Sequence, residues 1–344
     1  MTPSRLGTAG ATVRAMLALL PLLASSLAAA AGLPSTGVPS TSIVNGETEE
    51  GFPAVVALGA GAGEYTFSAC TGSIITPRIV LTAAHCGADL PLEAVVEFGQ
   101  AYFGTDVTDP DHTVGFEDMA VHPDYEELVS GPTESDLGQY DFAVLILEDD
   151  APVPALRINP TALTEADVGL ELVSVGFGIT SSAGSGSGTK RSADLVLDDV
   201  DEMFLYSNTS SSPEGGQICS GDSGGPQLAQ LDDSGEWIQV AVHSWGDVNC
   251  LYQSGSSRVD VGWDWILDQV EDEHGTRDLC EVNGRYEDGT CDAWCDLADP
   301  DCAVAEGDTG GEDEDGGKAC ASAAGLAGVG ALLPGLLAAL RRRR

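Results

Sequence analysis

Short apolar segments rich in β-branched residues recur through the middle of the chain, with glycine, serine and proline between them. This punctuation is typical of an all-β sandwich or a pair of barrels, because turn residues end each segment after a few positions. Residues 261–270 carry apolar side chains at helical spacing, and we expect this helix to close the domain. The predicted strands cover residues 54–58, 94–98, 141–147, 172–175 and 237–242, together with a hairpin over 73–82.

The charge and cysteine content of the chain narrow its function classes and its compartment. The 344 residues include 14 lysines and arginines against 55 aspartates and glutamates, which gives a formal net charge of −41. Such a charge repels nucleic acid and anionic membrane surfaces, so we expect no nucleic-acid partner. Nine cysteines are too many for a reduced cytosolic enzyme. They predict disulfides in an oxidising compartment, one cysteine left over, and an exported protein.

The first 42 residues have the composition of processing segments. Two arginines, an apolar run at 15–23 and small residues through 31 predict a signal peptide over residues 1–31. An N-terminal membrane anchor is the alternative, although the apolar run is short for one. Residues 32–42 are rich in proline, serine and threonine without periodicity, and we interpret them as a propeptide.

Residues 280–302 are small, acidic and dense in cysteine, which predicts a disulfide-stapled module too short for a core of its own. Its four cysteines allow three pairings, and the sequence does not choose among them. Calcium is one hypothesis for its aspartates, and a solvated acidic surface is the other, because the spacing matches no EF-hand loop. No other metal or cofactor is expected. These aspartates are Asp288, Asp292, Asp296, Asp299 and Asp301.

The C-terminal part after this module predicts a linker and a membrane-length segment. Residues 303–319 are acidic and glycine-rich, which predicts a disordered linker. Cys320 then precedes an apolar run at 321–340, long enough to span a bilayer, and four arginines. This pattern resembles a bacterial sorting signal of the MYXO-CTERM type, which implies a sorting protease and retention at the cell surface. A permanent single-span anchor and a buried core helix are the alternatives.

Ser223 is a candidate nucleophile because it lies between small residues, in Gly-Asp-Ser-Gly-Gly-Pro at 221–226. A serine needs a nearby base, and histidine titrates near neutrality. Of the five histidines, His85 ends an apolar run and precedes Cys86, which could fix its loop. Asp141 opens a predicted strand and is the candidate orienting carboxylate. The alternatives are an incidental glycine-rich turn at Ser223 and ordinary strand capping by Asp141.

Several motifs occur together in one order: Ile-Val-Asn-Gly at 43–46, Thr-Ala-Ala-His-Cys at 82–86, Asp141, Gly-Phe-Gly at 176–178, the Ser223 motif, and Ser-Trp-Gly at 244–246. Over about residues 43–270 the chain resembles trypsin/chymotrypsin-like serine proteases of the S1 family. The resemblance implies two six-stranded antiparallel β-barrels with a C-terminal helix over 43–273. It also implies disulfides Cys70–Cys86 and Cys219–Cys250, and a serine endopeptidase acting on polypeptides.

The resemblance also implies the roles of individual residues. Ser223 would be the nucleophile, His85 the general base and then acid, and Asp141 the group that holds the His85 tautomer. The backbone N–H groups of Gly221 and Ser223 would form the oxyanion hole, and Ser244 would support Asp141.

Activation is implied as well. Asp222 would pair with the α-amino group of Ile43 after cleavage, which makes the protein a zymogen that needs an activating protease. Two departures from the family pattern stand out: Ser42 precedes Ile43 in place of arginine or lysine, and residues 126–139 form an insertion.

The predicted specificity pocket lacks the acid that selects arginine or lysine. Gln217 stands at its floor, and a neutral floor gives no counter-charge for a buried cation. Ser220 and His243 resemble the pair that receives the carboxylate in glutamate-specific relatives, which is one hypothesis. A polar pocket for small or uncharged side chains is the alternative, and we favour it because the chain's own acidic loops would otherwise be cleaved. The remaining predicted pocket residues are Ser244, Trp245 and Gly246.

A second function class competes with the endopeptidase. A catalytically weak, protease-like module could serve surface binding or adhesion, with the acidic cysteine-rich segment doing the binding. No member of the predicted triad is missing, so the endopeptidase is favoured. Before any processing, the C-terminal segment would attach either form to a membrane.

Overall fold

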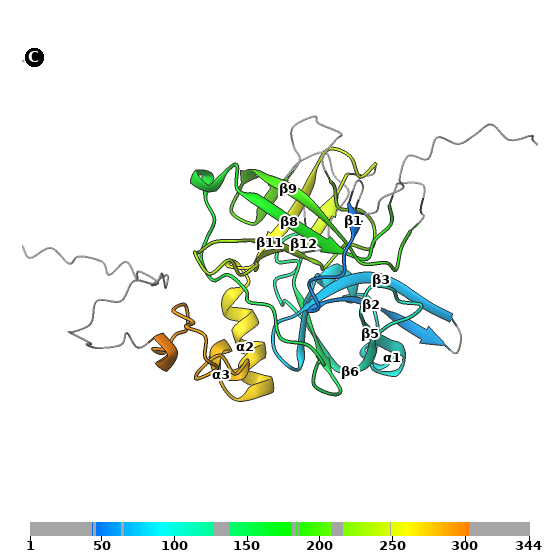
Figure 1. The fold of residues 1–344 in the computed structure, drawn as a ribbon. Coiled ribbons are helices and arrows are strands. Elements are labelled where there is room, and N and C mark those ends of the chain that lie inside the picture. Colours follow the sequence, from blue (N-terminus) through cyan, green and yellow to red (C-terminus); the bar gives the residue numbers. More distant parts are fainter. Residues whose placement is uncertain are drawn as a thin grey trace, which may run out of the picture. The chain divides into compact units, whose positions relative to one another are not determined.

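The computed structural model describes residue 43 and residues 46–62, 65–126, 138–180, 184, 186–207, 216–247 and 249–302. The predicted signal peptide, propeptide, acidic linker and C-terminal apolar segment lie outside these residues, as does most of the insertion at 126–139. The chain divides into two compact units, one ending at Gly284 and the other beginning at Arg285. Figure 1 shows that the first unit holds the strands and the longer helices.

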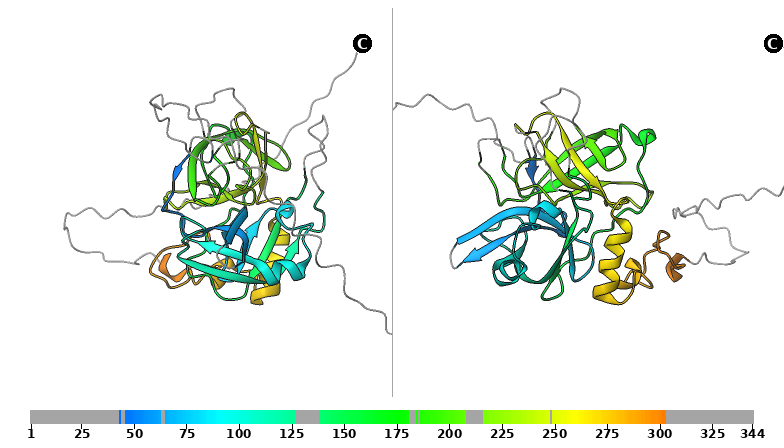
Figure 2. Two further views of the ribbon diagram at one scale, coloured as in Figure 1. Left: turned by 90° about the vertical axis from the view of Figure 1, so that its right-hand side faces the viewer. Right: turned by 180° about the vertical axis from the view of Figure 1, so that it is seen from behind.

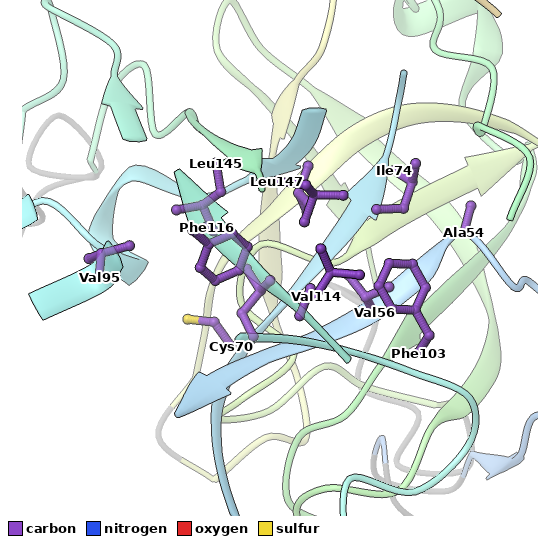
Figure 3. Packing of buried hydrophobic residues seen from close by; sticks show 13 residues of the cluster. Ala54, Val56, Cys70, Ile74, Val95, Phe103, Val114, Phe116, Leu145 and Leu147 are labelled. Carbon is purple, nitrogen blue, oxygen red and sulfur yellow. The ribbon is translucent and has the colours of Figure 1, made fainter. Parts of the chain in front are cut away.

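The first barrel is closed and consists of six antiparallel strands in the order β2-β3-β4-β7-β6-β5. Pairing of β5 with β2 closes it. Its interior holds a cluster of buried side chains that includes Val56, Ile74, Phe103 and Leu147, as Figure 3 shows. The strands are β2 (Val55–Ala62), β3 (Tyr65–Ile74), β4 (Ile79–Thr82), β5 (Gly99–Phe103), β6 (His112–Val121) and β7 (Ala143–Leu147).

The second barrel follows the order β9-β10-β13-β12-β11-β8 and closes through β8–β9 pairing, while β1 (Glu47–Thr48) adds to the edge of β9. Its core includes Leu172, Leu195, Leu205 and Val240. Figure 2 shows both barrels from two further sides. The predicted pair of six-stranded antiparallel barrels is thus confirmed. The strands are β8 (Glu171–Gly176), β9 (Arg191–Val200), β10 (Phe204–Ser207), β11 (Pro226–Ala229), β12 (Ile238–Gly246) and β13 (Ser254–Arg258).

One predicted strand is wrong. Residues 94–98 belong to helix α1 (Leu92–Phe98), and the strand of this region, β5, begins only at Gly99. Pro91 precedes the helix, where its missing N–H costs nothing. The Glu93 carboxylate in the first turn interacts favourably with the positive end of the helix dipole. The consecutive apolar residues imitated a strand, but Val96 and Phe98 are exposed and only Val95 of this helix is buried.

The predicted C-terminal helix is present as α2 (Trp263–His274), and it buries Ile266, Leu267 and Val270. These side chains join a cluster with Phe142 from the first barrel's side and Val242 from β12 of the second. The helix therefore covers the line where the two barrels meet. A short helix α3 (Leu279–Val282) follows, and the Asp278 side chain caps it by accepting the N–H groups of Cys280 and Glu281.

Both disulfides that the resemblance implied are present, Cys70–Cys86 and Cys219–Cys250. The second unit contains a further disulfide, Cys291–Cys302, and Cys280 and Cys295 are disulfide-bonded as well. All eight cysteines in the described part of the chain are thus oxidised, which agrees with the predicted compartment.

The acidic module uses several carboxylates to hold its own turns. Asp299 accepts the N–H groups of Asp292 and Asp301, Asp288 accepts that of Thr290, and Asp301 accepts that of Gly289. Within the described ranges, the one group with metal-ligand spacing is Cys70, His85 and Cys86, and its two cysteines form a disulfide. No helix among the described residues is long and apolar enough to cross a bilayer.

Candidate active site

The first barrel supplies His85 and Asp141. His85 lies in a single 3-10 turn (Ala84–Cys86) directly after β4, and the disulfide to Cys70 on β3 holds that turn against the barrel. Asp141 lies two residues before β7, which pairs with β4. Because β4 and β7 are neighbours, the two side chains emerge at the same end of the barrel.

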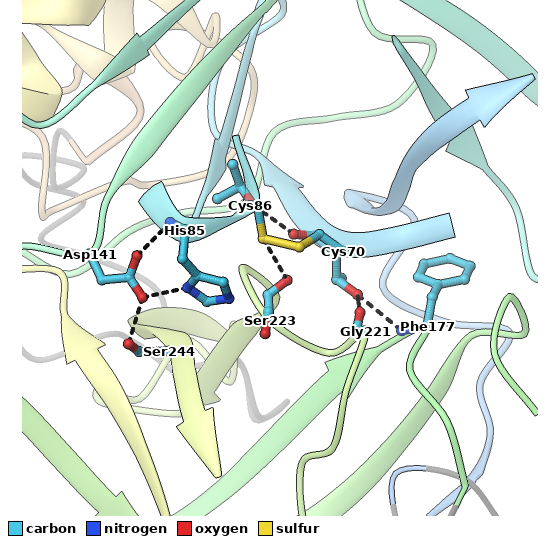
Figure 4. Close-up of a disulfide and its surroundings, with 10 residues drawn as sticks. Cys70, His85, Cys86, Asp141, Phe177, Gly221, Ser223 and Ser244 are labelled. Carbon is cyan, nitrogen blue, oxygen red and sulfur yellow. Dashed lines mark hydrogen bonds and ion pairs between the residues drawn. A yellow bond between two sulfur atoms is a disulfide. The ribbon is translucent and has the colours of Figure 1, made fainter. Parts of the chain in front are cut away.

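Asp141 orients the His85 ring through a short network that Figure 4 shows. Nδ1 of His85 lies 2.8 Å from Oδ2 of Asp141, and the His85 backbone N–H donates to Oδ1 at 3.0 Å. The Ser244 hydroxyl, from β12 of the second barrel, donates to Oδ2 at 2.6 Å. The Asp141 side chain is 2% exposed and that of His85 is 34% exposed. Asp141 is thus a buried anchor, and the outer part of the imidazole reaches solvent.

The second barrel supplies Ser223, on the loop between Cys219 and β11. In Figure 4 the His85 ring lies between Asp141 and Ser223. No hydrogen bond joins Ser223 Oγ to His85 among the residues described, a looseness that is common before substrate binds. With Nδ1 bound to the carboxylate, Nε2 of His85 is the ring atom left to receive a proton from this serine.

Thr71 on β3 ties this loop to the first barrel. Its backbone N–H donates to the Ser223 carbonyl at 2.8 Å, and its hydroxyl donates to the Gly221 carbonyl at 2.8 Å. The N–H groups of Gly221 and Ser223 donate to no protein group in the described part of the chain, so both are available to a ligand. Gly221 has φ +96°, and a Cβ there would lie 2.8 Å from Gly178 Cα, so only glycine fits.

Asp222, next to Ser223 in the chain, is fully buried. Its carboxylate accepts the N–H groups of Gly178 and Cys219, each at 2.8 Å. Burial raises its pKa to about 7, against the opposing effects of these two hydrogen bonds and the Arg191 charge. No ion pair holds Asp222 within the described ranges, and the Ile43 side chain is also buried.

Residues 43–266, which contain every element described above for this site, match the family model described as Trypsin. The chain belongs to the trypsin family of serine endopeptidases. It is 30% identical over 238 residues to CLIP domain-containing serine protease B10 of Anopheles gambiae, with 60% of this chain and 63% of that protein covered. Venom serine protease 34 of Apis mellifera is 27% identical over 216 residues, with 59% and 52% covered. Tryptase of Mus musculus is 27% identical over 290 residues, with 74% and 97% covered.

The chain thus spans less than two thirds of the length of two of these relatives.

In this trypsin-family chain, a pocket opens beside Ser223. Trp245, Gly246 and Ser220 line it as the sequence predicted, and Ser244 borders the neighbouring hollow beside His85. The lining residues are Ile218, Cys219, Ser220, Ser223, Trp245, Gly246, Asp247 and Cys250.

Two residues predicted for this pocket do not line it. Gln217 is buried and its side-chain oxygen accepts the Ile218 N–H. His243 is fully buried, its Nδ1 lies 3.1 Å from the Ser256 hydroxyl, and burial lowers its pKa to about 3. His243 is therefore a neutral side chain inside the second barrel at physiological pH.

Thr71 and Asp247 are not among the site residues predicted from the sequence. Asp247 directly follows Ser-Trp-Gly and precedes Cys250, so an aspartate at the start of a disulfide-bonded loop was the available signal. Nothing local distinguishes Thr71, because Gly221 and Phe177, the partners of its hydroxyl, lie more than a hundred positions away along the chain.

We predict that Ser244→Ala lowers kcat/KM about tenfold, because the buried Asp141 carboxylate loses a charge-assisted hydrogen bond. Ser174→Ala is the matched control, since its buried hydroxyl has no hydrogen-bond partner in the described part of the chain. Steady-state kinetics on a peptide p-nitroanilide measures both variants. Equal values for Ser244→Ala and the wild type would contradict a supporting role for Ser244.

Proposed function

We propose that this chain is an exported serine endopeptidase that hydrolyses polypeptides through an acyl-enzyme. The observation that carries the proposal is the buried Asp141, hydrogen-bonded to His85, with Ser223 on the other side of the ring. In this proposal Ser223 is the nucleophile, His85 the general base and then acid, and Asp141 the residue that holds the His85 tautomer.

The proposed reaction proceeds in two halves. Ser223 Oγ attacks the carbonyl carbon of the scissile bond while its proton moves to Nε2 of His85, and Asp141 stabilises the imidazolium. The N–H groups of Gly221 and Ser223 stabilise the oxyanion, and His85 then protonates the departing amine. In the second half, His85 takes a proton from a water molecule, and the resulting hydroxide attacks the carbonyl carbon of the acyl-enzyme ester. Ser223 Oγ then leaves and receives that proton from His85.

We predict that a fluorophosphonate probe labels the activated protein at Ser223, and that Ser223→Ala abolishes labelling and lowers kcat about 10⁴-fold or more. Ser220→Ala is the matched control for labelling, because this serine lies on the same loop and lines the pocket but stands outside the proposed triad. In-gel fluorescence and peptide hydrolysis provide the readouts. An unlabelled wild-type protein would favour a surface binding or adhesion module in place of an enzyme.

We further propose that the chain is made as a zymogen and activated by cleavage between Ser42 and Ile43. Asp222 supports this proposal, because a fully buried carboxylate without an ion pair in the described residues calls for a cation. The α-amino group of Ile43, released by cleavage, would be that cation. Since Ser42 occupies the position before the cut, we expect an activating protease without trypsin-like specificity.

We predict that the uncleaved chain becomes less stable as pH rises from about 4 to about 7, relative to its Asp222→Asn variant. The folded pKa of Asp222, about 7, exceeds its ordinary value of 3.8, so folding favours the protonated form. The difference in melting temperature between the two proteins reports this effect. After cleavage before Ile43, this pH-dependent loss of stability should vanish. A loss of stability that persists in the cleaved protein would contradict pairing of Asp222 with the new terminus.

We propose that the pocket receives an uncharged side chain rather than an arginine, lysine or glutamate. Gln217, where the resemblance expects an acid in relatives that select arginine or lysine, is neutral and lies outside the lining, so it supplies no counter-charge for a basic side chain. Acidic specificity would need a cation, but His243 is buried, outside the lining, and lowered in pKa to about 3. Among the described residues that line the pocket, Asp247 alone is charged, and it repels a carboxylate.

We predict that peptide p-nitroanilides with leucine, alanine or glutamine before the scissile bond are cleaved faster than those with glutamate or lysine. A margin of about tenfold follows from the cost of placing an unpaired charge in the pocket. Initial rates at equal substrate concentration measure it. Faster cleavage after glutamate would restore the acidic hypothesis.

The segments outside the described residues remain proposals drawn from the sequence. We propose a signal peptide at 1–31, a propeptide at 32–42, a linker at 303–319 and a sorting or anchoring segment at 320–344. Their support is composition, and the oxidised cysteines of the described part agree with export.

A further inference from the structure

The outer wall of the specificity pocket is the loop that connects β12 to β13. The two strands pair up to Gly246 and Ser254, and the Asp247 N–H donates to the Gln253 carbonyl at 2.8 Å to close the base of the loop. Asp247 and Cys250 of this loop line the pocket together with Ile218 and Ser220. The width of the pocket therefore depends on where the backbone of this loop lies.

The Asp247 carboxylate binds the backbone of its own loop at four points. Its Oδ1 accepts the N–H of Asn249 at 2.9 Å. Its Oδ2 accepts those of Leu251, Tyr252 and Gln253, at 2.9, 2.7 and 3.2 Å. A run of N–H groups that converges on one anion is a nest, and here the anion is part of the chain.

The loop needs this support because its backbone follows an uncommon path. Cys250 has φ +55°, in the left-handed region that a non-glycine residue enters at a cost. The Cys219–Cys250 disulfide joins the loop at one point to Cys219, which also lines the pocket. The Asp247 carboxylate fixes the residues on the far side of Cys250, where no disulfide acts.

The same hydrogen bonds explain how a carboxylate can line a pocket for uncharged side chains. Partial burial works against the ionised form of Asp247, but the four N–H groups together outweigh it, and its pKa is lowered. Oδ2 already accepts three N–H groups and Oδ1 accepts one, so most of the hydrogen-bonding capacity of the carboxylate is used by the loop backbone. A substrate cation would compete with these bonds for the carboxylate.

We infer that Asp247 is a positioning residue that sets the width of the specificity pocket by organising the backbone of its outer wall. The inference rests on the proposed endopeptidase function and deepens it, since it names the residue on which substrate selection depends. Asp247 touches neither the triad nor the oxyanion hole, so its effect should fall on recognition of the substrate side chain.

The test compares Asp247→Asn with the wild type on two peptide p-nitroanilides that carry leucine or glycine before the scissile bond. An amide offers one acceptor oxygen and turns an NH₂ toward backbone donors, so the wall loosens. We expect KM for the leucine substrate to rise about tenfold while kcat stays within about twofold. KM for the glycine substrate should change by less than about twofold, because glycine has no side chain to contact the wall.

Asp201→Asn is the matched control. Asp201 also accepts backbone N–H groups, those of Met203 and Phe204, but it does not line the pocket. This variant should leave both KM values unchanged. If Asp247→Asn fails to fold, Asp247→Ser, which keeps one acceptor oxygen, takes its place. An unchanged leucine-to-glycine KM ratio, or equal changes for both substrates, would overturn the inference.

Amide hydrogen exchange tests the inference without catalysis. Exchange at Leu251 and Tyr252 should accelerate about tenfold or more in Asp247→Asn and stay at the wild-type rate in Asp201→Asn. Protection that is the same in all three proteins would overturn the inference even if the kinetics changed. A wild-type protein that the fluorophosphonate probe does not label would instead overturn the proposed function, so the two failures are distinguishable.

Discussion

The active site depends on buried hydrogen bonds that cross from one barrel to the other at Thr71. This residue is fully buried on β3, and its backbone and hydroxyl reach the carbonyl groups of Ser223 and Gly221. The Thr71 hydroxyl also accepts the Phe177 N–H, and the Thr82 hydroxyl donates to the Thr71 carbonyl. A dry environment strengthens such bonds and makes their loss costly. The first barrel carries His85 and Asp141 of the proposed triad and the second carries Ser223, so the alignment of Ser223 with His85 depends on this junction.

The sequence could predict the parts of the fold and site that follow from local residues. The two barrels, the closing helix and both disulfides of the protease region were expected, since motifs around Cys86, Asp141 and Ser223 occur in a fixed order. The strand prediction for residues 94–98 is wrong because a short apolar run fits a strand and a helix equally well, and only Pro91 and Glu93 before it favour the helix. Strand β13 was missed for the opposite reason: its sequence is Ser-Gly-Ser-Ser-Arg, and only pairing with β10 and β12 makes it a strand. Burial of His243 is likewise a property of the barrel interior, which no local pattern reports.

Many aspartates in this acidic chain are bound by the backbone rather than by basic side chains. Asp222 accepts two N–H groups, Asp247 four, and Asp299 two within the acidic module. With 14 basic side chains against 55 acidic ones, ion pairing could satisfy only a minority of the carboxylates. The loops that build the pocket and its surroundings accordingly take their shape from charge-assisted bonds to N–H groups. Such bonds are local and directional, so they hold a turn at a defined geometry where a mobile lysine would not.

The short strand β1 restricts how far a terminus at Ile43 could travel. Glu47 and Thr48 pair with Ser192 and Arg191 of β9, and the Glu49 side chain accepts the Ser192 hydroxyl at 2.6 Å. Only residues 43–46 would lie between that fixed strand and a new amino group. At roughly 3.5 Å for each residue, the amine is confined within about 14 Å of the strand. The second barrel thus acts as a tether: it keeps the amine at a high effective concentration near the protein surface, so pairing would be an intramolecular event that dilution cannot weaken.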